Sequence, residues 1–251
     1  MNKIRESFSK QKLLIPYICA GDPSLEITRK LIFKLDKGGA DIIELGIPFS
    51  DPLADGPVIQ KAGERALNNG TTLSQILSMT EEISPHIDAS LVLMGYYNPI
   101  LKYGKEKFIN DIQNAGISGV IIPDLPYEED RNFYKKLNKC NISGILLAAP
   151  NTPDNRLHEL GKKTTGFLYC VSLLGVTGDN KGPYKEINKY ISRIRSQVDL
   201  PLALGFGIDG PEKAKIVSQY VDGIIIGSAI INIINKNKKN TETMLKKVEN
   251  F

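Results

Sequence analysis

Eight short apolar runs, many of them rich in β-branched residues, recur along the chain at intervals that mostly leave room for a helix. The runs are continuous and do not alternate with polar residues, as expected for strands that are covered on both faces. They are Leu13–Cys19, Asp41–Leu45, Leu91–Met94, Gly119–Ile122, Gly144–Ala148, Gly166–Val171, Pro201–Leu204 and Gly223–Ile226. Eight strand–helix units in 251 residues are the stoichiometry of a closed parallel α/β barrel, the (β/α)8 or TIM barrel. We expect one barrel domain over residues 1–251, with a doubly wound sheet as the second interpretation.

Helix signals lie between these runs. Ser24 is placed to cap a helix with an apolar face, and Gly38-Gly39 is placed to end it. The segment 128–138 begins with three acidic residues and ends among lysines, which suits the helix dipole. Pro211 follows Asp209-Gly210 and predicts a helix start.

The composition excludes several classes of function. A formal net charge of only +4 gives little support for binding nucleic acid or membranes. No run approaches the ~18 apolar residues of a membrane span, and we expect no signal or transit peptide before the barrel. Three widely spaced cysteines indicate a reducing compartment, and no metal-ligand spacing appears. We expect the cytoplasm, with a plastid stroma as the alternative, and no metal.

The stretch of residues 44–57, ELGIPFSDPLADGP, is the most informative motif. It follows Ile42-Ile43, so Glu44 lies at or near the end of a buried strand. Prolines fix φ and glycines permit positive φ, so the following loop has a restricted shape. We expect Glu44 to face the barrel mouth, where burial raises its pKa; the alternative is a surface or salt-bridged residue.

Two further acids in this loop have competing interpretations. Asp51 precedes Pro52 and reads mainly as a turn residue. Asp55 precedes Gly56, and from the residues alone a catalytic role and an Asp-Gly turn are equally supported. Two carboxylates in different environments are what acid–base catalysis requires. His86 and His158 have no partner in the sequence and read as solvated helix residues.

Three glycine-rich turns follow the last three strands. They are Gly175-Val176-Thr177-Gly178, Gly205-Phe206-Gly207 and Gly227-Ser228. Loops at this rim of a barrel often bind phosphate through backbone N–H groups and a helix N-terminus. Each turn alone reads as a tight turn, but together they favour a phosphate site with Ser228 as a helix N-cap.

These elements, with Pro16–Pro23 and Pro123–Pro126, closely resemble the tryptophan synthase alpha chain family, in order and over essentially the whole chain. The resemblance implies a TIM barrel with an extra N-terminal helix, for which residues 2–9 are available. It also implies retro-aldol cleavage of indole-3-glycerol phosphate to indole and glyceraldehyde 3-phosphate. Two departures stand out: Leu173-Leu174 makes its loop more apolar than in many relatives, and Tyr17 replaces a commoner phenylalanine.

The resemblance also implies site residues. Glu44 matches the general acid–base, Asp55 the acid that stabilises charge at the indole nitrogen, and Tyr169 the tyrosine beside the reacting carbons. Thr177 matches the threonine that holds Asp55 when the loops close. Matches to the phosphate site are Gly178, Phe206, Gly207, Gly227 and Ser228, and matches to the indole pocket are Tyr17, Leu93 and Phe206.

The resemblance implies a partner and no cofactor in this chain. The partner is the tryptophan synthase beta chain, which carries pyridoxal phosphate, in an alpha2-beta2 heterotetramer. Loops 46–57 and 172–186 are expected to order together on binding ligand and partner. The alternatives are a stand-alone lyase that releases free indole, another phosphate-binding barrel such as a sugar-phosphate isomerase, and a pseudo-enzyme that only activates a beta chain. Glu44, Asp55 and Tyr169 together argue against the last.

Overall fold

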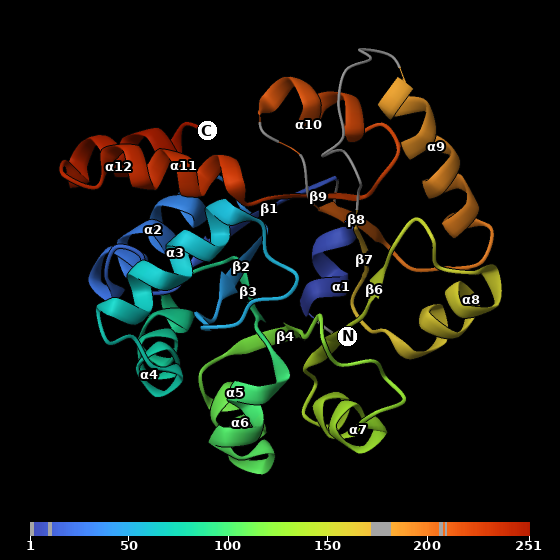
Figure 1. Ribbon diagram of the computed structural model, residues 1–251, viewed down its shortest axis with the longest axis horizontal. Helices are drawn as coiled ribbons and strands as arrows, with labels where there is room; N and C mark the ends of the chain where they lie inside the picture. Colours follow the sequence, from blue (N-terminus) through green and yellow to red (C-terminus); the bar gives the residue numbers. More distant parts are fainter. Residues whose placement is uncertain (1–2, 10–11, 172–181, 206–207, 209) are drawn as a thin grey trace.

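Parallel strands form a barrel at the centre of the molecule, and helices surround it (Figure 1). The computed structural model describes residues 3–9, 12–171, 182–205, 208 and 210–251. Within these residues the strand order is β5-β4-β3-β2-β1-β9-β8-β7-β6. Only Leu146 separates β5 (Ser143–Ile145) from β6 (Leu147–Ala148), so both ends of this order belong to one interrupted strand. The sheet therefore closes into an eight-stranded barrel, which confirms the predicted TIM barrel.

Each of the eight apolar runs overlaps a strand. The other strands are β1 (Leu13–Cys19), β2 (Ile42–Gly46), β3 (Ser90–Met94), β4 (Ile117–Ile121), β7 (Leu168–Val171), β8 (Leu202–Gly205) and β9 (Gly223–Ile226). The helices are α1 (Lys3–Phe8), α2 (Leu25–Lys37), α3 (Pro57–Asn68), α4 (Leu73–Ile83), the 3-10 helix η1 (Ser84–His86), α5 (Tyr97–Tyr103), α6 (Lys105–Asn114), α7 (Arg131–Lys139), α8 (Asp154–Lys163), α9 (Gly182–Arg195), α10 (Pro211–Val217), α11 (Ser228–Asn237) and α12 (Thr241–Glu249).

The predicted helix signals act where expected. The Ser24 hydroxyl accepts a hydrogen bond from the N–H of Ile27 at 3.2 Å, and α2 ends at Gly38. Asp130 caps α7 in the same way through the N–H of Phe133. Pro211 is the first residue of α10. Two details differ. Helix α7 begins at Arg131, so the three acidic residues precede the helix and its first turn holds no acid. Gly227 is the N-cap of α11, and Ser228 is its first residue.

Strand register decides which side chains enter the barrel, because alternate residues of a barrel strand face its interior. Tyr17 pairs with Glu44, and Glu44 pairs with Val92. A Cβ atom at Gly46 would lie 2.5 Å from Cζ of Tyr17, so Gly46 and Tyr17 face the same side. Glu44 is therefore on the interior face of β2, with Tyr17 beside it.

Helix α1 covers the end of the barrel where the strands begin. Its Ile4 is fully buried, and the ring of its Phe8 lies 5.5 Å from that of Phe167, the residue before β7. Phe8 also packs against Gly223 at the start of β9. Figure 1 shows α1 in the middle of the ring of helices.

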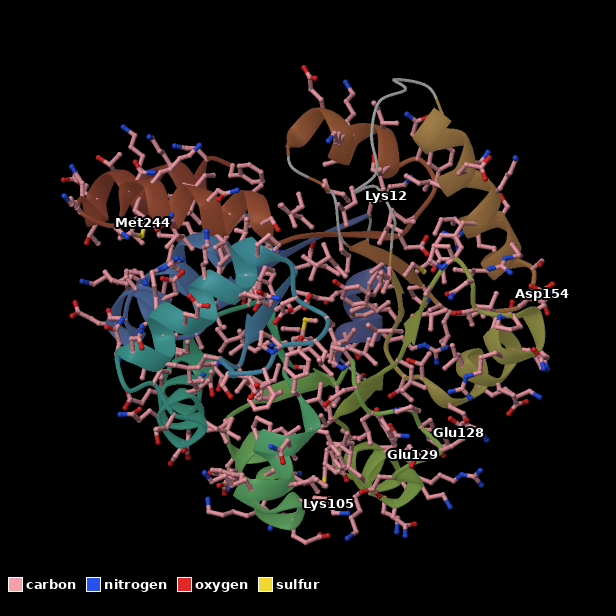
Figure 2. All side chains as sticks on the ribbon, viewed as in Figure 1. Lys12, Lys105, Glu128, Glu129, Asp154 and Met244 are labelled. Carbon is pink, nitrogen blue, oxygen red and sulfur yellow. The ribbon has the colours of Figure 1, made fainter. Side chains whose placement is uncertain are left out.

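Charged side chains lie mainly on the outside of the helix ring, as Lys105, Glu128, Glu129 and Asp154 do in Figure 2. Among the described residues, no helix combines the length and the apolar character needed to cross a bilayer. The same part of the chain holds no group of three or more His, Cys, Asp or Glu side chains that could bind a metal ion.

Candidate active site

Glu44 is a buried acid on the interior face of β2. Glu44 is 1% exposed. Among the described residues, neither of its carboxylate oxygens has a hydrogen-bond partner. An ionised carboxylate in such a place has lost its hydration without compensation. Burial therefore raises the pKa of Glu44, with a further contribution from the negative charge of Asp55, to about 8. Near neutral pH Glu44 is protonated and able to donate a proton.

Asp55 reaches the same region from the loop of residues 47–56 that joins β2 to α3. Its N–H donates to the carbonyl of Pro52 at 3.4 Å, and its carbonyl accepts from Nε2 of Gln60 at 2.8 Å. Burial raises the pKa of Asp55, while a hydrogen bond from the Tyr96 hydroxyl lowers it. Asp55 is only partly buried, so its carboxyl group ionises more readily than that of Glu44.

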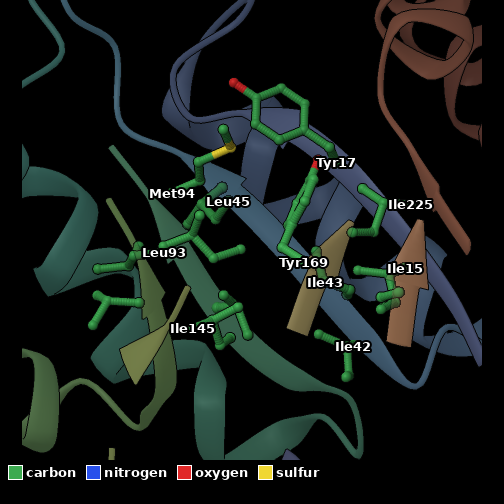
Figure 3. Packing of buried hydrophobic residues seen from close by; sticks show 14 of the residues in the cluster. Ile15, Tyr17, Ile42, Ile43, Leu45, Leu93, Met94, Ile145, Tyr169 and Ile225 are labelled. Atoms are coloured by element: carbon green, nitrogen blue, oxygen red, sulfur yellow. The ribbon is translucent and has the colours of Figure 1, made fainter. Parts of the chain in front are cut away.

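Two tyrosines line the barrel interior, as Figure 3 shows. Tyr17 comes from β1 and Tyr169 from β7, and both are almost completely buried. Burial raises the pKa of each hydroxyl, and the charges of Glu44 and Asp55 raise it further. Both tyrosines therefore stay neutral. The hydroxyl of Tyr17 lies against Gly46 and that of Tyr169 against Gly205, at positions where a Cβ atom would overlap them.

On strand β3, Met94 and not Leu93 lies on the interior face of the barrel. Leu93 pairs with Leu45, which points away from the interior because its neighbour Glu44 points inward. Met94 pairs with Gly46 and so lies on the interior face near Tyr17, where Figure 3 shows its thioether. The register therefore favours Met94 over Leu93 for a place on the interior face, and counting in steps of two from Glu44 across the strand register leads to Met94.

The structure describes only part of the predicted phosphate site. Gly227 caps α11 without a side-chain hydrogen bond, and Ser228 begins this ten-residue helix. A Cβ at Gly227 would lie 3.3 Å from Cδ1 of Tyr17, so the backbone there is close to this tyrosine of the interior. The first N–H groups of the helix are thus available to an anion. Thr177, Gly178, Phe206, Gly207 and most of the loop 172–186 lie outside the described residues.

The structure also shows a partly buried ion pair that the sequence did not reveal. Nε and one terminal nitrogen of Arg65, on α3, donate to the two carboxylate oxygens of Asp22, each at 2.7 Å. Asp22 follows β1 and is 1% exposed. A two-point Arg–carboxylate pair fixes orientation as well as distance. It ties the loop after β1 to the helix that directly follows the loop of Asp55.

The site thus combines a protonated acid, a second and less buried acid, and two neutral phenols around an apolar surface. Such a pair of carboxyl groups with separated pKa values can donate a proton at one point and stabilise positive charge at another. Sequence position indicated Glu44 and Asp55, and the family resemblance indicated Tyr17 and Tyr169. The structure brings these four together. Tyr96 and the Asp22–Arg65 pair have no local sequence signal, because their roles depend on contacts between different loops.

Comparison with known proteins adds an independent result. The family model described as tryptophan synthase alpha chain matches residues 4–251. A tryptophan synthase alpha chain from Petrotoga mobilis is 54% identical over 251 residues, covering 100% of this chain and 97% of that protein. The crystal structure of tryptophan synthase subunit alpha from Legionella pneumophila has a TM-score of 0.88 and 36% identity, with 100% of both chains covered. A tryptophan synthase complex from Pyrococcus furiosus gives 0.85 and 36%, covering 95% of this chain and 97% of that one.

Proposed function

Because the chain belongs to the tryptophan synthase alpha chain family, we propose that it cleaves indole-3-glycerol phosphate to indole and glyceraldehyde 3-phosphate. The reaction is a retro-aldol cleavage, and its enzyme class is a carbon–carbon lyase. The observation that carries this proposal is the state of Glu44: buried, without a hydrogen-bond partner among the described residues, and with its pKa raised to about 8. A carboxyl group in that state can both give and take a proton near neutral pH.

Glu44 is the general acid–base in this proposal. Its proton goes to C3 of the indole ring, which turns the ring into a carbon leaving group. Its carboxylate takes the proton of the glycerol hydroxyl on the carbon bonded to the ring. As that C–O becomes a carbonyl, the carbon–carbon bond breaks and its electrons return to the ring. Glu44 thus gives one proton to the ring and takes one proton from the hydroxyl, so it ends the reaction in its starting state.

Asp55 stabilises the positive charge that protonation at C3 places on the indole nitrogen. Its ionised form is the useful one, and the hydrogen bond from Tyr96 favours that form. A fixed negative charge in a site that excludes water stabilises such a cation more than bulk solvent does. The two acids thus have different tasks because their environments separate their pKa values.

The apolar surface around them suits an indole ring. Tyr17, Met94 and Tyr169 present rings and a thioether to the interior, and polarisable groups of this kind pack well against aromatic faces. Tyr169 lies beside Glu44 and so beside the reacting carbons. The glycerol phosphate would extend toward Gly227 and Ser228, where the N-terminus of α11 stabilises the negative charge.

The proposed partner is a beta chain that carries pyridoxal phosphate, in an alpha2-beta2 heterotetramer. Leu53 supports a contact through the loop 47–56, because it is 88% exposed at the tip of this loop, two residues before Asp55. Indole is small and apolar enough to cross membranes, so passing it directly to the partner prevents its loss. A stand-alone lyase has no comparable observation in its favour, and the relative from Pyrococcus furiosus was solved as a complex.

We place this activity in the cytoplasm, with a plastid stroma as the alternative. A phosphorylated substrate is charged and does not cross a bilayer unaided. Cys19, Cys140 and Cys170 are all unbridged, which suits a reducing compartment.

The experiment that tests the function is an assay of indole release from indole-3-glycerol phosphate by the purified chain, alone and with a beta chain. The proposal expects slow release by the chain alone and faster turnover with the partner. Absence of indole release under both conditions would refute the lyase. Full speed without the partner, unchanged by its addition, would favour the stand-alone enzyme.

A further inference from the structure

Tyr96 connects the loop after β3 to the loop that carries Asp55. It lies between Met94 at the end of β3 and Tyr97 at the start of α5, and it is 4% exposed. Its ring lies 5.4 Å from that of Phe49, and its hydroxyl accepts a hydrogen bond from the N–H of Ala54 at 2.9 Å. The same hydroxyl donates to the carboxylate of Asp55. One side chain therefore contacts the loop near its beginning and near its end.

The base of the two loops is joined as well. The N–H of Ile47 donates to the carbonyl of Met94 at 2.7 Å. Gly95 leaves room for Ile47, because a Cβ atom at Gly95 would lie 2.9 Å from Cδ1 of that residue. The loop after β3 is thus held against the start of the loop 47–56. From it, the side chain of Tyr96 extends to the segment that carries Asp55.

We propose that Tyr96 is a positioning residue for Asp55: its hydroxyl holds the Ala54–Asp55 segment and directs the carboxylate at the indole nitrogen. This inference rests on the proposed function for the task that Asp55 performs. It adds a residue that no sequence motif indicated. It also connects the exposed Leu53 to the site, because Leu53 directly precedes Ala54, the residue that Tyr96 holds.

The charges around Asp55 set the direction of the expected pH effect. Titratable groups that interact with it come from β1, β2, the loop after β3 and β7, namely Tyr17, Cys19, Glu44, Tyr96 and Tyr169. Among these groups, Tyr96 donates a hydrogen bond that lowers the pKa of Asp55. Tyr96 also faces Asp124, whose charge adds to that of Asp55 in raising the pKa of the tyrosine. Loss of the hydroxyl must therefore raise the pKa of Asp55.

The test compares Tyr96→Phe with Tyr97→Phe. Tyr97 is the next residue, but its hydroxyl donates to Asp130 and does not touch the loop 47–56. Each variant is assayed for kcat, KM and pH profile, alone and with a beta chain, and its melting temperature is measured. Tyr96→Phe removes a hydrogen bond to a charged group, and this bond stabilises the transition state in the proposal. Its kcat should therefore fall about tenfold or more, with KM little changed. The acidic limb of the pH–activity profile of Tyr96→Phe should move to higher pH, while Tyr97→Phe should behave as the wild type.

A second readout does not depend on activity. In protein with 13C-labelled aspartate carboxyl groups, the Asp55 resonance is assigned by its loss in Asp55→Asn and then titrated. The pKa of Asp55 should be higher in Tyr96→Phe than in the wild type and in Tyr97→Phe. If the wild type released no indole, the proposed function would fail, and this titration would still decide the role of Tyr96. An unchanged Asp55 pKa and an unmoved acid limb, even with a lower melting temperature, would overturn the inference.

Discussion

Glu44 and Asp55 interact electrostatically although they belong to different elements, one on strand β2 and the other on the loop that follows it. Burial accounts for most of the rise in the Glu44 pKa, and the charge of Asp55 adds to it. This pair supports the proposed division of tasks, in which the fully buried Glu44 supplies the proton and the less buried Asp55 supplies the negative charge. The predictions below follow from this pair and from its surroundings.

The stability of the protein should depend on Glu44 over a defined pH window. The unfolded pKa is near 4.5 and the folded pKa is about 8, so between these values the folded state alone keeps the proton. Stability should therefore fall as pH rises through this window, by up to about 1.4 kcal/mol per pH unit. Glu44→Gln removes the titration. Its melting temperature, relative to the wild type, should rise with pH across the window; a difference independent of pH would contradict the assigned pKa.

Asp55→Asn should be much more harmful to the isolated lyase than Asp51→Asn. Asp55 supplies a charge beside the acid, whereas Asp51 is exposed and contacts its neighbour Ser50. Loss of a preorganised charge costs roughly 10²–10³-fold in kcat. Asp55→Asn should also lower the pKa of Glu44, so the alkaline limb of any residual activity should move to lower pH. Equal losses in both variants would remove the distinction between the two acids.

The fold was largely predictable because strands and their spacing are local features of the sequence. The run Gly144–Ala148 was correctly placed, but its interruption at Leu146 depends on how two neighbouring strands pair with it. Glu44 could be found from its place after Ile42-Ile43. Leu93 could not be separated from Met94 without the register between strands, and Tyr96 acts across two loops. Thus side-chain direction and contacts between loops were the information that the sequence lacked.

Leu53→Asp should weaken coupling to the beta chain with little effect on the chain alone. Leu53 is 88% exposed, so an aspartate there costs little in the isolated protein. In an interface the same residue would be buried, and an unpaired charge there is expensive. We expect the beta-chain concentration for half-maximal activation to rise at least about tenfold. Leu67→Asp, on α3 and 37% exposed, is the matched control; if it has the same effect, the contact is not specific to the loop.

Ser228→Ala should weaken binding of the phosphate-bearing substrate and leave the fold intact. Ser228 is the first residue of α11, so its N–H and its hydroxyl belong to the turn of the helix that favours an anion. One hydrogen bond to a charged group corresponds to about tenfold in affinity. A crystal structure with substrate analogue should show the phosphate at the N–H groups of Gly227 and Ser228. A phosphate bound only elsewhere at saturating ligand would refute this site.

The most direct test of the account is the turnover of Glu44→Gln with indole-3-glycerol phosphate, in the presence of a saturating beta chain. The amide keeps the size and shape of the side chain but has no proton to give. Turnover should fall by roughly 10²–10⁴-fold or more, while substrate binding and the circular dichroism spectrum stay close to those of the wild type. If this variant releases indole within a few-fold of the wild-type rate, Glu44 is not the general acid–base and the proposed mechanism is wrong.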